Sequence, residues 1–503
     1  MERLAYRNGE FEVTFAYNEQ TKRNELSLTS KASGRRFAKH THFNLLDEHG
    51  ELLEVKPITE DIAQFILNNF EIKGDTESFS IFKTDLEQGT IDHTRKITLR
   101  PQSILHKITK SENNYTATGA KLHYHWPIFK KFKETGFGSI IRATLTLHQK
   151  CSSRCHYCST ISRNKSDSIT LDEAKRFVDK LYSGQALFNK KHFPEYNELY
   201  QRHCGSDIRV RGIILSGGGQ PNLWPHFAEF VQWLSGLDID LGLITNGFPK
   251  SVPEEIYNSF KWIRISITPE DASPFYPDQR FDKQYLPATI LHNDKVTVGY
   301  SYVVGAWTDD EIFTRINRSL DENGFRYCRV LADCNLTREM QLKSHEMLSK
   351  RLLHLGLIAE DGQPLGRIFH QLKYHGYKDD AMRIWERGQC YVQTYNVFWD
   401  TTDHDENKYS YCYPCDSVTV LTDTKDDGGV IPSARRFNHA KWGTVKNTEV
   451  EKLYTEPVKP FFDPRQRCLS CLFMRNNKTI LDMMNSNTDF LPVSTELDHV
   501  NFP

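Results

Sequence analysis

The chain has 503 residues and a formal net charge of −1, because 64 lysines and arginines nearly balance 65 aspartates and glutamates. Its length predicts two or three domains, and the balance of charge argues against a bulk polyanion binder or a disordered acidic tail. The start, MERLAYRNGE, lacks the apolar segment of a secretory signal, and no stretch nears the roughly 18 consecutive apolar residues of a membrane span. We therefore expect a soluble, cytoplasmic protein with no membrane partner.

Residues 1–135 are predicted to form a β-rich N-terminal domain that could dock a substrate. The segment 10–17, EFEVTFAY, alternates apolar and polar residues with the two-residue period of a half-buried strand. The segment 44–55, NLLDEHGELLEV, has a polar, Gly-containing centre between two apolar runs and predicts a hairpin. The segment 59–70 predicts a helix with Thr59 as its N-cap.

Residues 138–335 show a different pattern, in which short apolar runs alternate with helical segments. Such alternation is typical of parallel βαβ units, and six or so units predict an α/β fold, a partial (β/α)6 TIM-like barrel. We expect strands at 140–147, 208–218, 240–247, 260–268, 295–305 and 327–333, with helices at 171–182, 227–237 and 311–324. Active sites in such folds gather at the carboxyl ends of the strands, and Cys151 follows the first of them.

The remainder is predicted to form a helical bridge at 336–385, a small Cys-rich domain at 386–480 and a polar tail at 481–503. The Cys-rich part has too little regular apolar pattern for a core of its own. A bound metal would compensate for that lack.

The segment CSSRCHYC places Cys151, Cys155 and Cys158 within eight residues, and no further cysteine follows before Cys204. Clustered cysteines in a reducing compartment more often hold metals than form disulfides. A structural zinc needs four protein ligands, which would recruit His148 or His156 here. A [4Fe–4S] cube held by three thiolates instead keeps one iron open for a substrate or cofactor.

The C-x3-C-x2-C spacing, with the aromatic Tyr157 before its last cysteine, resembles the hallmark of the radical S-adenosylmethionine (SAM) enzymes. Three later segments resemble other motifs of that family in the expected order: LSGGGQPNL at 215–223 its GGE motif, LITNG at 243–247 the strand end near the SAM ribose and carboxylate, and ISIT at 265–268 the next strand end. The resemblance implies SAM contacts by Tyr157, Gly218, Gly219, Gln220, Asn246 and Ser266.

One position departs from the family pattern, because Gln220 stands where the family has glutamate. A neutral amide oxygen accepts a hydrogen bond from an amine without charge assistance. Either SAM is held less tightly through this contact, or backbone carbonyls near Gly218 and Gly219 bind its amino group.

The chemistry that the resemblance implies is reductive cleavage of SAM at the cluster. The products are methionine and a 5'-deoxyadenosyl radical, which abstracts hydrogen from the substrate. An electron donor such as flavodoxin or ferredoxin would supply the electron. The protein contributes position, electrostatics and exclusion of water and oxygen.

A second cysteine group comprises Cys390, Cys412, Cys415, Cys468 and Cys471. Two CxxC pairs can surround either zinc or an iron–sulfur cluster. The arrangement resembles the C-terminal SPASM or twitch extension of radical SAM enzymes, in which a cysteine precedes a hairpin and another follows it. That resemblance implies one auxiliary [4Fe–4S] cluster on Cys390, Cys412, Cys468 and Cys471, with Cys415 spare or displacing Cys390; a structural zinc is the alternative.

The three remaining cysteines and the aromatic residues near position 125 are interpreted mainly as structural residues. Cys204, Cys328 and Cys334 are predicted to be small buried side chains, although Cys334 follows a predicted strand and is a candidate radical or hydrogen-atom donor. His123, His125 and Trp126 are predicted to pack or to line an entry loop.

Two substrate classes compete. The extension is associated with peptide or protein modification, which β-augmentation on the β-rich domain would serve, although the usual leader-binding pattern is missing. The alternative is a nucleotide or nucleic-acid base, bound by the aromatic and basic segment 123–133 with Lys130, Lys131 and Lys133, and by Arg209 and Arg211. A small-molecule pathway intermediate is a third option.

Overall fold

The computed structural model describes the backbone of nine strands between residues 3 and 99, and then the following ranges: 118–153, 155, 165–247, 252–267, 290, 293–304, 308, 310–322, 324–332, 338–358, 364–370, 390–400, 411–413, 423–424, 430–431, 443–444, 449–458, 473–485 and 499–503. The chain divides into two compact units. The first unit contains residues 1–112 and 481–496, and the second, here called the sheet unit, contains 113–480 and 497–503.

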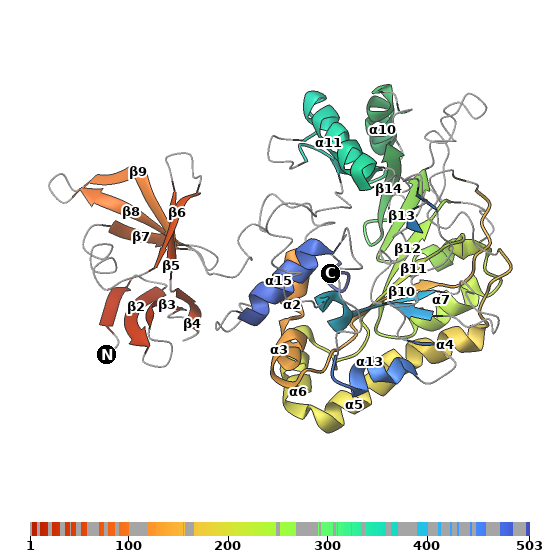
Figure 1. The fold of residues 1–503 in the computed structure, drawn as a ribbon, viewed down its shortest axis with the longest axis horizontal. Coiled ribbons are helices and arrows are strands. Elements are labelled where there is room, and N and C mark those ends of the chain that lie inside the picture. Colours follow the sequence, from red (N-terminus) through yellow and green to blue (C-terminus); the bar gives the residue numbers. More distant parts are fainter. Residues whose placement is uncertain are drawn as a thin grey trace. The chain divides into compact units, whose positions relative to one another are not determined.

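The first unit contains two antiparallel sheets (Figure 1). Their strands are β1 (Arg3–Arg7), β2 (Phe11–Asn18), β3 (Arg23–Ser30), β4 (Arg36–His40), β5 (His42–Leu46), β6 (Leu52–Pro57), β7 (Phe70–Gly74), β8 (Phe79–Asp85) and β9 (Thr90–Leu99). One sheet has the order β1-β2-β3-β4 and the other β6-β5-β9-β8-β7. The predicted strand at 10–17 is confirmed as β2, and the predicted hairpin as the antiparallel pair β5–β6. The predicted helix at 59–70 lies outside the described residues, apart from Phe70 in β7.

The sheet unit is organised around one ten-stranded sheet with the order β16-β15-β14-β13-β12-β11-β10-β17-β18-β21. Its strands are β10 (Arg142–Thr146), β11 (Gly212–Ser216), β12 (Asp240–Thr245), β13 (Trp262–Ile267), β14 (Thr297–Val304), β15 (Tyr327–Ala332), β16 (Ile368–His370), β17 (Asn396–Asp400), β18 (Tyr411–Tyr413) and β21 (Gly443–Thr444). The eight strands from β16 to β17 are parallel, whereas β18 and β21 are antiparallel. A small separate pair joins β19 (Asp423–Thr424) to β20 (Val430–Ile431).

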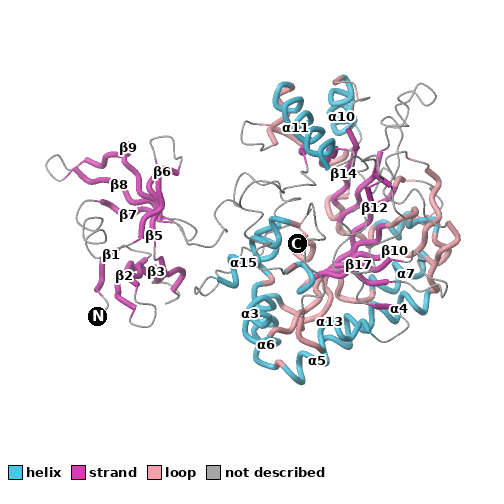
Figure 2. Tube along the Cα trace, in the orientation of Figure 1, coloured by secondary structure: helices cyan, strands magenta, loops and turns pink. Residues whose placement is uncertain are grey.

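Helices cover the sheet, as the cyan elements of Figure 2 show. The α-helices are α2 (Thr118–Tyr124), α3 (Trp126–Thr135), α4 (Leu171–Asp179), α5 (Gln185–His192), α6 (Pro194–Cys204), α7 (Phe227–Ser235), α8 (Glu254–Tyr257), α10 (Glu311–Glu322), α11 (Arg338–His354), α13 (Lys452–Thr455) and α15 (Met474–Asn485). Shorter elements are the π-helical turn η2 (Lys180–Gly184) and the 3-10 turns η3 (Pro221–Leu223), η5 (Tyr391–Thr394) and η9 (Glu449–Glu451).

Alternate residues of each parallel strand face the helices. In β10, Ala143 and Leu145 join one hydrophobic core with residues of α4, α7, α8, α10 and α11, while Arg142, Thr144 and Thr146 point to the opposite face. The other strands follow the same alternation. The sheet therefore has an apolar face under the helices and a second face that carries polar side chains.

Local signals explain where the helices begin and end. Thr170 caps α4: its hydroxyl accepts the backbone N–H of Glu173, whose side chain accepts the N–H of Thr170 at 2.9 Å. Helix α3 has Pro127 in its first turn and ends at Gly136, whose φ of 79° suits a left-handed C-cap.

Residues 499–503 lie along the amino ends of the strands. Asn501 donates to Asp240 at 2.8 Å, His499 is 2.9 Å from the Thr297 hydroxyl, and Phe502 packs edge-on against Trp262. Asn501 and Phe502 are buried. The predicted polar tail is therefore wrong for these last residues, because the sheet edge supplies them with both polar and aromatic partners.

Every predicted strand between 138 and 335 is found, as are the predicted helices at 171–182, 227–237 and 311–324. The predicted bridge contains α11 and also β16, a strand that was not expected. The two units divide at residue 112, so α2 and α3 lie in the sheet unit rather than with the β-rich domain predicted for 1–135. Among the described residues, no helix has both the length and the apolar character needed to cross a membrane.

One lysine is fully enclosed within the helical layer. Lys131 of α3 has 0% exposure, and its amine donates to the Gly138 carbonyl at 3.0 Å and to Asn189 Oδ1 at 2.7 Å. It also lies 5.0 Å from the centre of the Phe193 ring. Burial lowers the pKa of Lys131 from 10.5 to about 7, because desolvation disfavours the charged amine.

This lowered pKa predicts a stability that rises with pH. Between pH 7 and 10.5 the unfolded chain holds a proton on Lys131 that the folded chain does not, so the free energy of unfolding should rise by up to about 1.4 kcal/mol per pH unit. Below pH 7 both states are protonated and this dependence disappears. Between pH 7 and pH 9 the urea unfolding midpoint of wild type should rise relative to the midpoint of Lys131→Met, measured at pH 7, 8 and 9. Lys130→Met serves as the control at an exposed site, and parallel pH profiles for wild type and Lys131→Met would contradict the prediction.

Candidate functional site at the carboxyl edge of the sheet

Four of the predicted motifs come together at one edge of the parallel sheet. Thr146, the last residue of β10, is in register with Ser216, the last residue of β11. The ends of β12 and β13 follow alongside, with Thr245 opposite Ile265. Because parallel strands end at the same edge, the cysteine loop after β10, the glycines after β11, Asn246 after β12 and Ser266 near the end of β13 all lie there.

The glycine loop after β11 is pressed against the backbone that follows β10. A Cβ atom on Gly219 would lie 2.4 Å from the Lys150 carbonyl oxygen and 2.6 Å from the Gln149 carbonyl carbon. A Cβ on Gly218 would meet the side chain of Gln149. Gly219 therefore has to lack a side chain for this contact, and the reason is close approach rather than an unusual φ.

Gln220 joins three strand ends. Its N–H donates to the Lys150 carbonyl at 2.7 Å, and its own carbonyl lies 2.6 Å from His148 Nε2. Its side-chain Oε1 accepts the N–H of Asn246 at 2.8 Å, and its Nε2 donates to the Thr245 hydroxyl. The Asn246 N–H can only donate, so it fixes which end of the amide is the oxygen. The side chain of Gln220 is 2% exposed and engaged at both ends.

Asn246 connects this network to the cysteine loop. Its Nδ2 donates to the hydroxyls of both Ser152 and Ser153 at 2.9 Å. The N–H of Ser153 in turn points to the sulfur of Cys151 at 3.4 Å. Hydrogen bonds therefore run from β11 through the end of β12 to the first cysteine. The side chain predicted to contact SAM here supports the loop that carries Cys151.

Cys151 and Cys155 are partly exposed, whereas Tyr157 and Cys158 lie outside the described residues. Within the described ranges no three metal-ligating side chains converge. His148, the zinc ligand considered from the sequence, has Nε2 directed at the Gln220 carbonyl. Burial lowers the pKa of His148, partly offset by that hydrogen bond, so its imidazole favours the neutral form at physiological pH.

The polar face of the sheet adds residues that sequence patterns did not single out. Ser266 is in register with Ser301 of β14, which is in register with Arg329 of β15. The three positions share the face opposite the hydrophobic core, because their neighbours in each strand belong to that core. Alternation within each strand could have indicated this row, but only the sheet order makes its members neighbours.

The second cysteine group is only partly described. Cys390 comes directly before η5, and Cys412 is a backbone position in β18, opposite Trp399 of β17. An antiparallel pair, β17–β18, does follow Cys390, but Cys412 lies within its second strand and not after the hairpin as predicted. Its place was not foreseen, since β17 extends the sheet beside β10. Cys415, Cys468 and Cys471, and also Cys334, lie outside the described residues.

Cys204 and Cys328 are buried, as predicted. Burial raises the pKa of the Cys204 thiol to about 12 and that of Cys328 further still, which makes both unreactive as nucleophiles. His125 is buried with Nδ1 at 2.7 Å from the Tyr200 hydroxyl and is a packing residue, as predicted. His123 is buried too.

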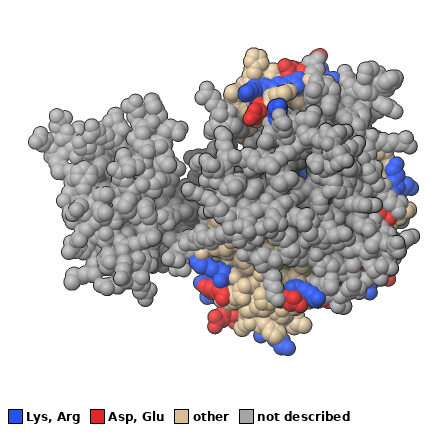
Figure 3. Space-filling model, in the orientation of Figure 1, with Lys and Arg blue, Asp and Glu red and all other residues tan. Residues whose placement is uncertain are grey.

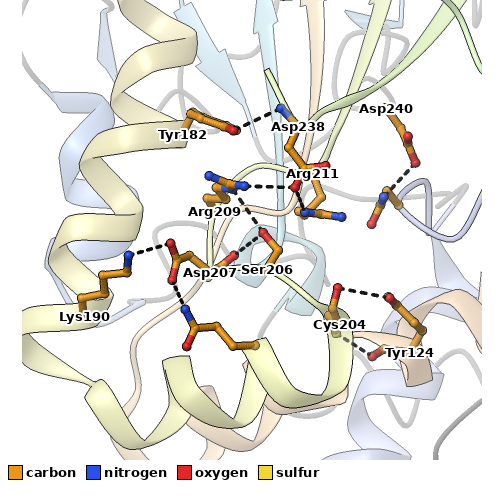
Figure 4. A network of polar contacts seen from close by, with 12 residues as sticks. Tyr124, Tyr182, Lys190, Cys204, Ser206, Asp207, Arg209, Arg211, Asp238 and Asp240 are labelled. Atoms are coloured by element: carbon orange, nitrogen blue, oxygen red, sulfur yellow. Dashed lines mark hydrogen bonds and ion pairs between the residues drawn. The ribbon is translucent and has the colours of Figure 1, made fainter. Parts of the chain in front are cut away.

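The basic residues considered for nucleic-acid binding are in other interactions. Arg209 and Arg211 both pair with Asp238, at 3.0 and 2.5 Å, and Arg209 also stacks over Tyr182 (Figure 4). They lie before or at the amino end of β11, the edge opposite the cysteine loop. Lys130 pairs with Glu134 at 2.7 Å.

The distribution of charge on the surface agrees with the pairing of these basic residues with acidic ones. On the face drawn in Figure 3, described basic residues lie among acidic ones and form no continuous patch of one sign. Of the basic residues named from the sequence, Lys131 is buried, Lys130, Arg209 and Arg211 are in ion pairs, and Lys133 is exposed.

No protein-family model matches the chain, and no curated protein matches it. Among solved structures the chain is similar to SuiB from Streptococcus suis bound to the precursor peptide SuiA, with 12% identity over 77% of this chain and 88% of that chain and a TM-score of 0.43. SuiB bound to S-adenosylmethionine aligns over 81% and 93%, also at 12% identity, with a TM-score of 0.42. BtrN in complex with AdoMet and 2-DOIA aligns at 12% identity over 69% and 93%, with a TM-score of 0.28. We draw the function below from the residues of this chain.

The tight glycine contact predicts different effects for two neighbouring substitutions. Gly219→Ala would drive a methyl group into the backbone of 149–150 and should cost about 1–3 kcal/mol of stability, the usual range for overpacking. Gly218→Ala meets the end of the Gln149 side chain, which can turn away, and should cost less. Thermal unfolding of the two variants checks this order. Equal midpoints for both would show that the loop adapts and that close approach does not dictate the glycines.

Proposed function

We propose that this chain is a radical SAM enzyme. The observation that carries the proposal is the position of Cys151, which begins C-x3-C-x2-C shortly after β10 and lies beside a glycine loop and Asn246 from the next two strands. Three thiolates at the carboxyl edge of a parallel sheet suit a [4Fe–4S] cluster with one open iron.

The residues present fit the cluster chemically. The sulfur of Cys151 faces a backbone N–H, and hydrogen bonds to sulfur are a normal feature of cluster thiolates. Cys151, Cys155 and Cys158 would hold the cluster. When bound, the cluster and SAM supply reductive cleavage to a 5'-deoxyadenosyl radical that abstracts hydrogen from the substrate. An external donor such as flavodoxin or ferredoxin provides the electron.

The binding of SAM involves the glycine loop rather than the amide of Gln220. Because both ends of that amide already have partners, the backbone carbonyls of the loop are the better acceptors for the SAM amino group. Gly217 is exposed and Gly219 partly exposed, whereas Gln220 is buried. Tyr157, Asn246 and Ser266 line the remaining SAM site.

The second cysteine group holds an auxiliary [4Fe–4S] cluster in this proposal, as in SPASM or twitch extensions. Its support is the antiparallel pair β17–β18, which follows Cys390 and contains Cys412 in its second strand. The substrate is a peptide or protein side chain. The first unit offers sheet edges at β1, β4, β6 and β7 for strand addition. Ion pairing and burial of the basic residues disfavour the nucleic-acid alternative.

Changing Cys151, Cys155 and Cys158 together to alanine tests the enzyme class. After anaerobic reconstitution, wild type should bind roughly eight irons per chain and the triple variant roughly four, because each cube holds four. The variant should also stop producing 5'-deoxyadenosine from SAM under reducing conditions. Cys204→Ala, a buried cysteine outside both groups, is the matched control and should retain iron and turnover. A colourless wild type, or zinc at residues 151–158, would refute the proposal.

Gln220→Glu tests how SAM is bound. Glutamate would place a buried charge at a site with 2% exposure and would remove the donor to Thr245, so we expect unchanged or weaker SAM binding. Titration calorimetry on the reconstituted, oxygen-protected protein measures this affinity. Tightening by tenfold or more, about 1.4 kcal/mol, would instead indicate a direct side-chain contact with the SAM amine.

A further inference from the structure

The face of the parallel sheet opposite the hydrophobic core, here called the inner face, is partly open to solvent. On β13, β14 and β15 the residues that face the helices, such as Ile265, Tyr300 and Val330, are 0% exposed. The residues between them point to the inner face, because side chains alternate along a strand. The partly exposed inner-face residues are Ile214, Ser216, Ile244, Arg264, Ser266, Val303 and Arg329. This face is therefore accessible from solution.

Two arginines occupy the inner face on strands that are separated by one other strand. Ser266 of β13 is in register with Ser301 of β14, which is in register with Arg329 of β15. Arg264 precedes Ser266 by two positions and is in register with Gly299 of β14. Gly299 and the two serines carry only a hydrogen atom or a hydroxymethyl group. No large side chain of β14 therefore separates Arg264 from Arg329 on this face.

Two aromatic rings lie across the inner face beside Arg264 and toward the amino edge. A Cβ atom on Gly299 would lie 2.4 Å from Cζ of Tyr327, so that ring covers the glycine. A Cβ atom on Gly242 would lie 2.3 Å from Cζ2 of Trp262. Tyr327 is 6% and Trp262 9% exposed, and the Arg264 guanidinium lies 5.8 Å from the Trp262 ring centre. These buried rings support Arg264 from one side and leave little surface on which a ligand could stack.

The chemistry of the inner face favours an anionic ligand group. The charged residues at the inner-face positions of β13, β14 and β15 are Arg264 and Arg329, and both keep their charge at any physiological pH. The planar fork of a guanidinium matches the two oxygens of a carboxylate, and partial enclosure strengthens the attraction. A nucleotide would also need an open aromatic surface for its base, which Trp262 and Tyr327 do not provide because they are buried.

We propose that Arg264 and Arg329 bind a carboxylate of the peptide substrate and so hold the residue to be modified beside SAM. This inference rests on the proposed function, in which Ser266 lines the SAM site. Ser266 is two positions from Arg264 along β13 and shares a row with Arg329 through Ser301. A carboxylate bound by the arginines therefore lies next to that site. The substrate class is a peptide with an acidic side chain or a free terminal carboxylate close to the reacting atom.

The chain offers a matched control three residues before Arg329. Arg326 lies directly before β15, its side chain is 43% exposed, and it pairs with Asp294 at 2.7 Å. It has the same chemical group as the two inner-face arginines and belongs to the same part of the chain as Arg329. Arg326 should therefore report any general effect of an added ion without taking part in the proposed site.

Site-resolved chemical modification of the full chain, anaerobically reconstituted, tests the anion site. Phenylglyoxal reacts with accessible guanidinium groups, and peptide mass spectrometry gives the rate at each arginine. The probes are N-acetylglutamate α-amide, with a side-chain carboxylate, N-acetylglycine, with a terminal one, and the neutral N-acetylglutamine α-amide. At roughly ten times its Kd, an acidic probe should slow the modification of Arg264 and Arg329 about tenfold. The neutral probe should not slow it, and Arg326 should react at one rate throughout.

The pattern of protection decides the inference. Protection by either acidic probe supports it, and the better probe shows whether the carboxylate is a side-chain or a terminal one. Equal protection by acidic and neutral probes, or none, overturns it. Stronger protection by adenosine monophosphate than by both acidic probes overturns it in favour of a nucleotide. Protection by SAM and by no acidic probe overturns it as well, since the arginines would then bind the carboxylate of SAM.

Exchanging one arginine adds a second measurement. Arg329→Lys keeps the charge but loses the planar fork, so the Kd of the acidic probe, followed through protection of Arg264, should rise about tenfold. The affinity for SAM should stay unchanged, and Arg326→Lys should leave the Kd of the probe unchanged. An unaltered Kd in Arg329→Lys would contradict the role of Arg329. If that variant does not fold, the protection pattern of wild type decides alone.

The outcomes also separate this inference from the proposed function. Protein that binds iron and forms 5'-deoxyadenosine, but whose two arginines no acidic probe protects, refutes the anion site and leaves the enzyme class intact. Protein that binds no iron, but in which acidic probes protect both arginines, refutes the enzyme class and leaves the anion site intact.

Discussion

The candidate site depends on one close backbone contact, between the loop after β11 and the segment after β10. Gly218 and Gly219 have no side chains to hold these two segments apart, so the N–H of Gln220 reaches the carbonyl of Lys150. The cysteine loop begins at the next residue, Cys151. The position of Cys151 is therefore set by backbone packing between neighbouring parallel strands.

Gln220 shows how an amide can replace a carboxylate in such a place. An amide has a donor and an acceptor, and here both are used inside the protein, toward Thr245 and Asn246. A carboxylate can only accept, and at this degree of burial its charge would need a cation for compensation. The neutral residue connects the strand ends, and in the function proposed above the backbone carbonyls nearby accept the hydrogen bond from the SAM amine. Asn246 extends the same network to the serines between the cysteines.

The two edges of the parallel sheet differ in chemistry. At the amino edge, Arg211 pairs with Asp238, and residues 499–503 contact the first residues of several strands. These contacts satisfy charges and cover apolar surface, which suits an edge that serves stability. At the carboxyl edge Gln220 and Asn246 hydrogen-bond to the segment 150–153, and the row Ser266, Ser301 and Arg329 crosses the face opposite the hydrophobic core. Such a difference, with the site at the carboxyl edge and stabilising contacts at the amino edge, is usual for α/β folds.

The sequence by itself determined the parallel strands from β10 to β15, the helices between them and the cysteine loop after the first strand, because period-two and helical patterns and ligand spacing are local properties. The resemblance of the second cysteine group also implied a hairpin after Cys390, and β17–β18 is found there with Cys412 in its second strand. Only the tertiary structure decided that β17 joins the sheet beside β10, that Lys131 is enclosed, that Arg209 and Arg211 share Asp238, and that Asn477 reaches the turn at Cys390. Each of these depends on contacts between residues distant in the chain, and no local pattern records which distant partner a polar side chain will meet.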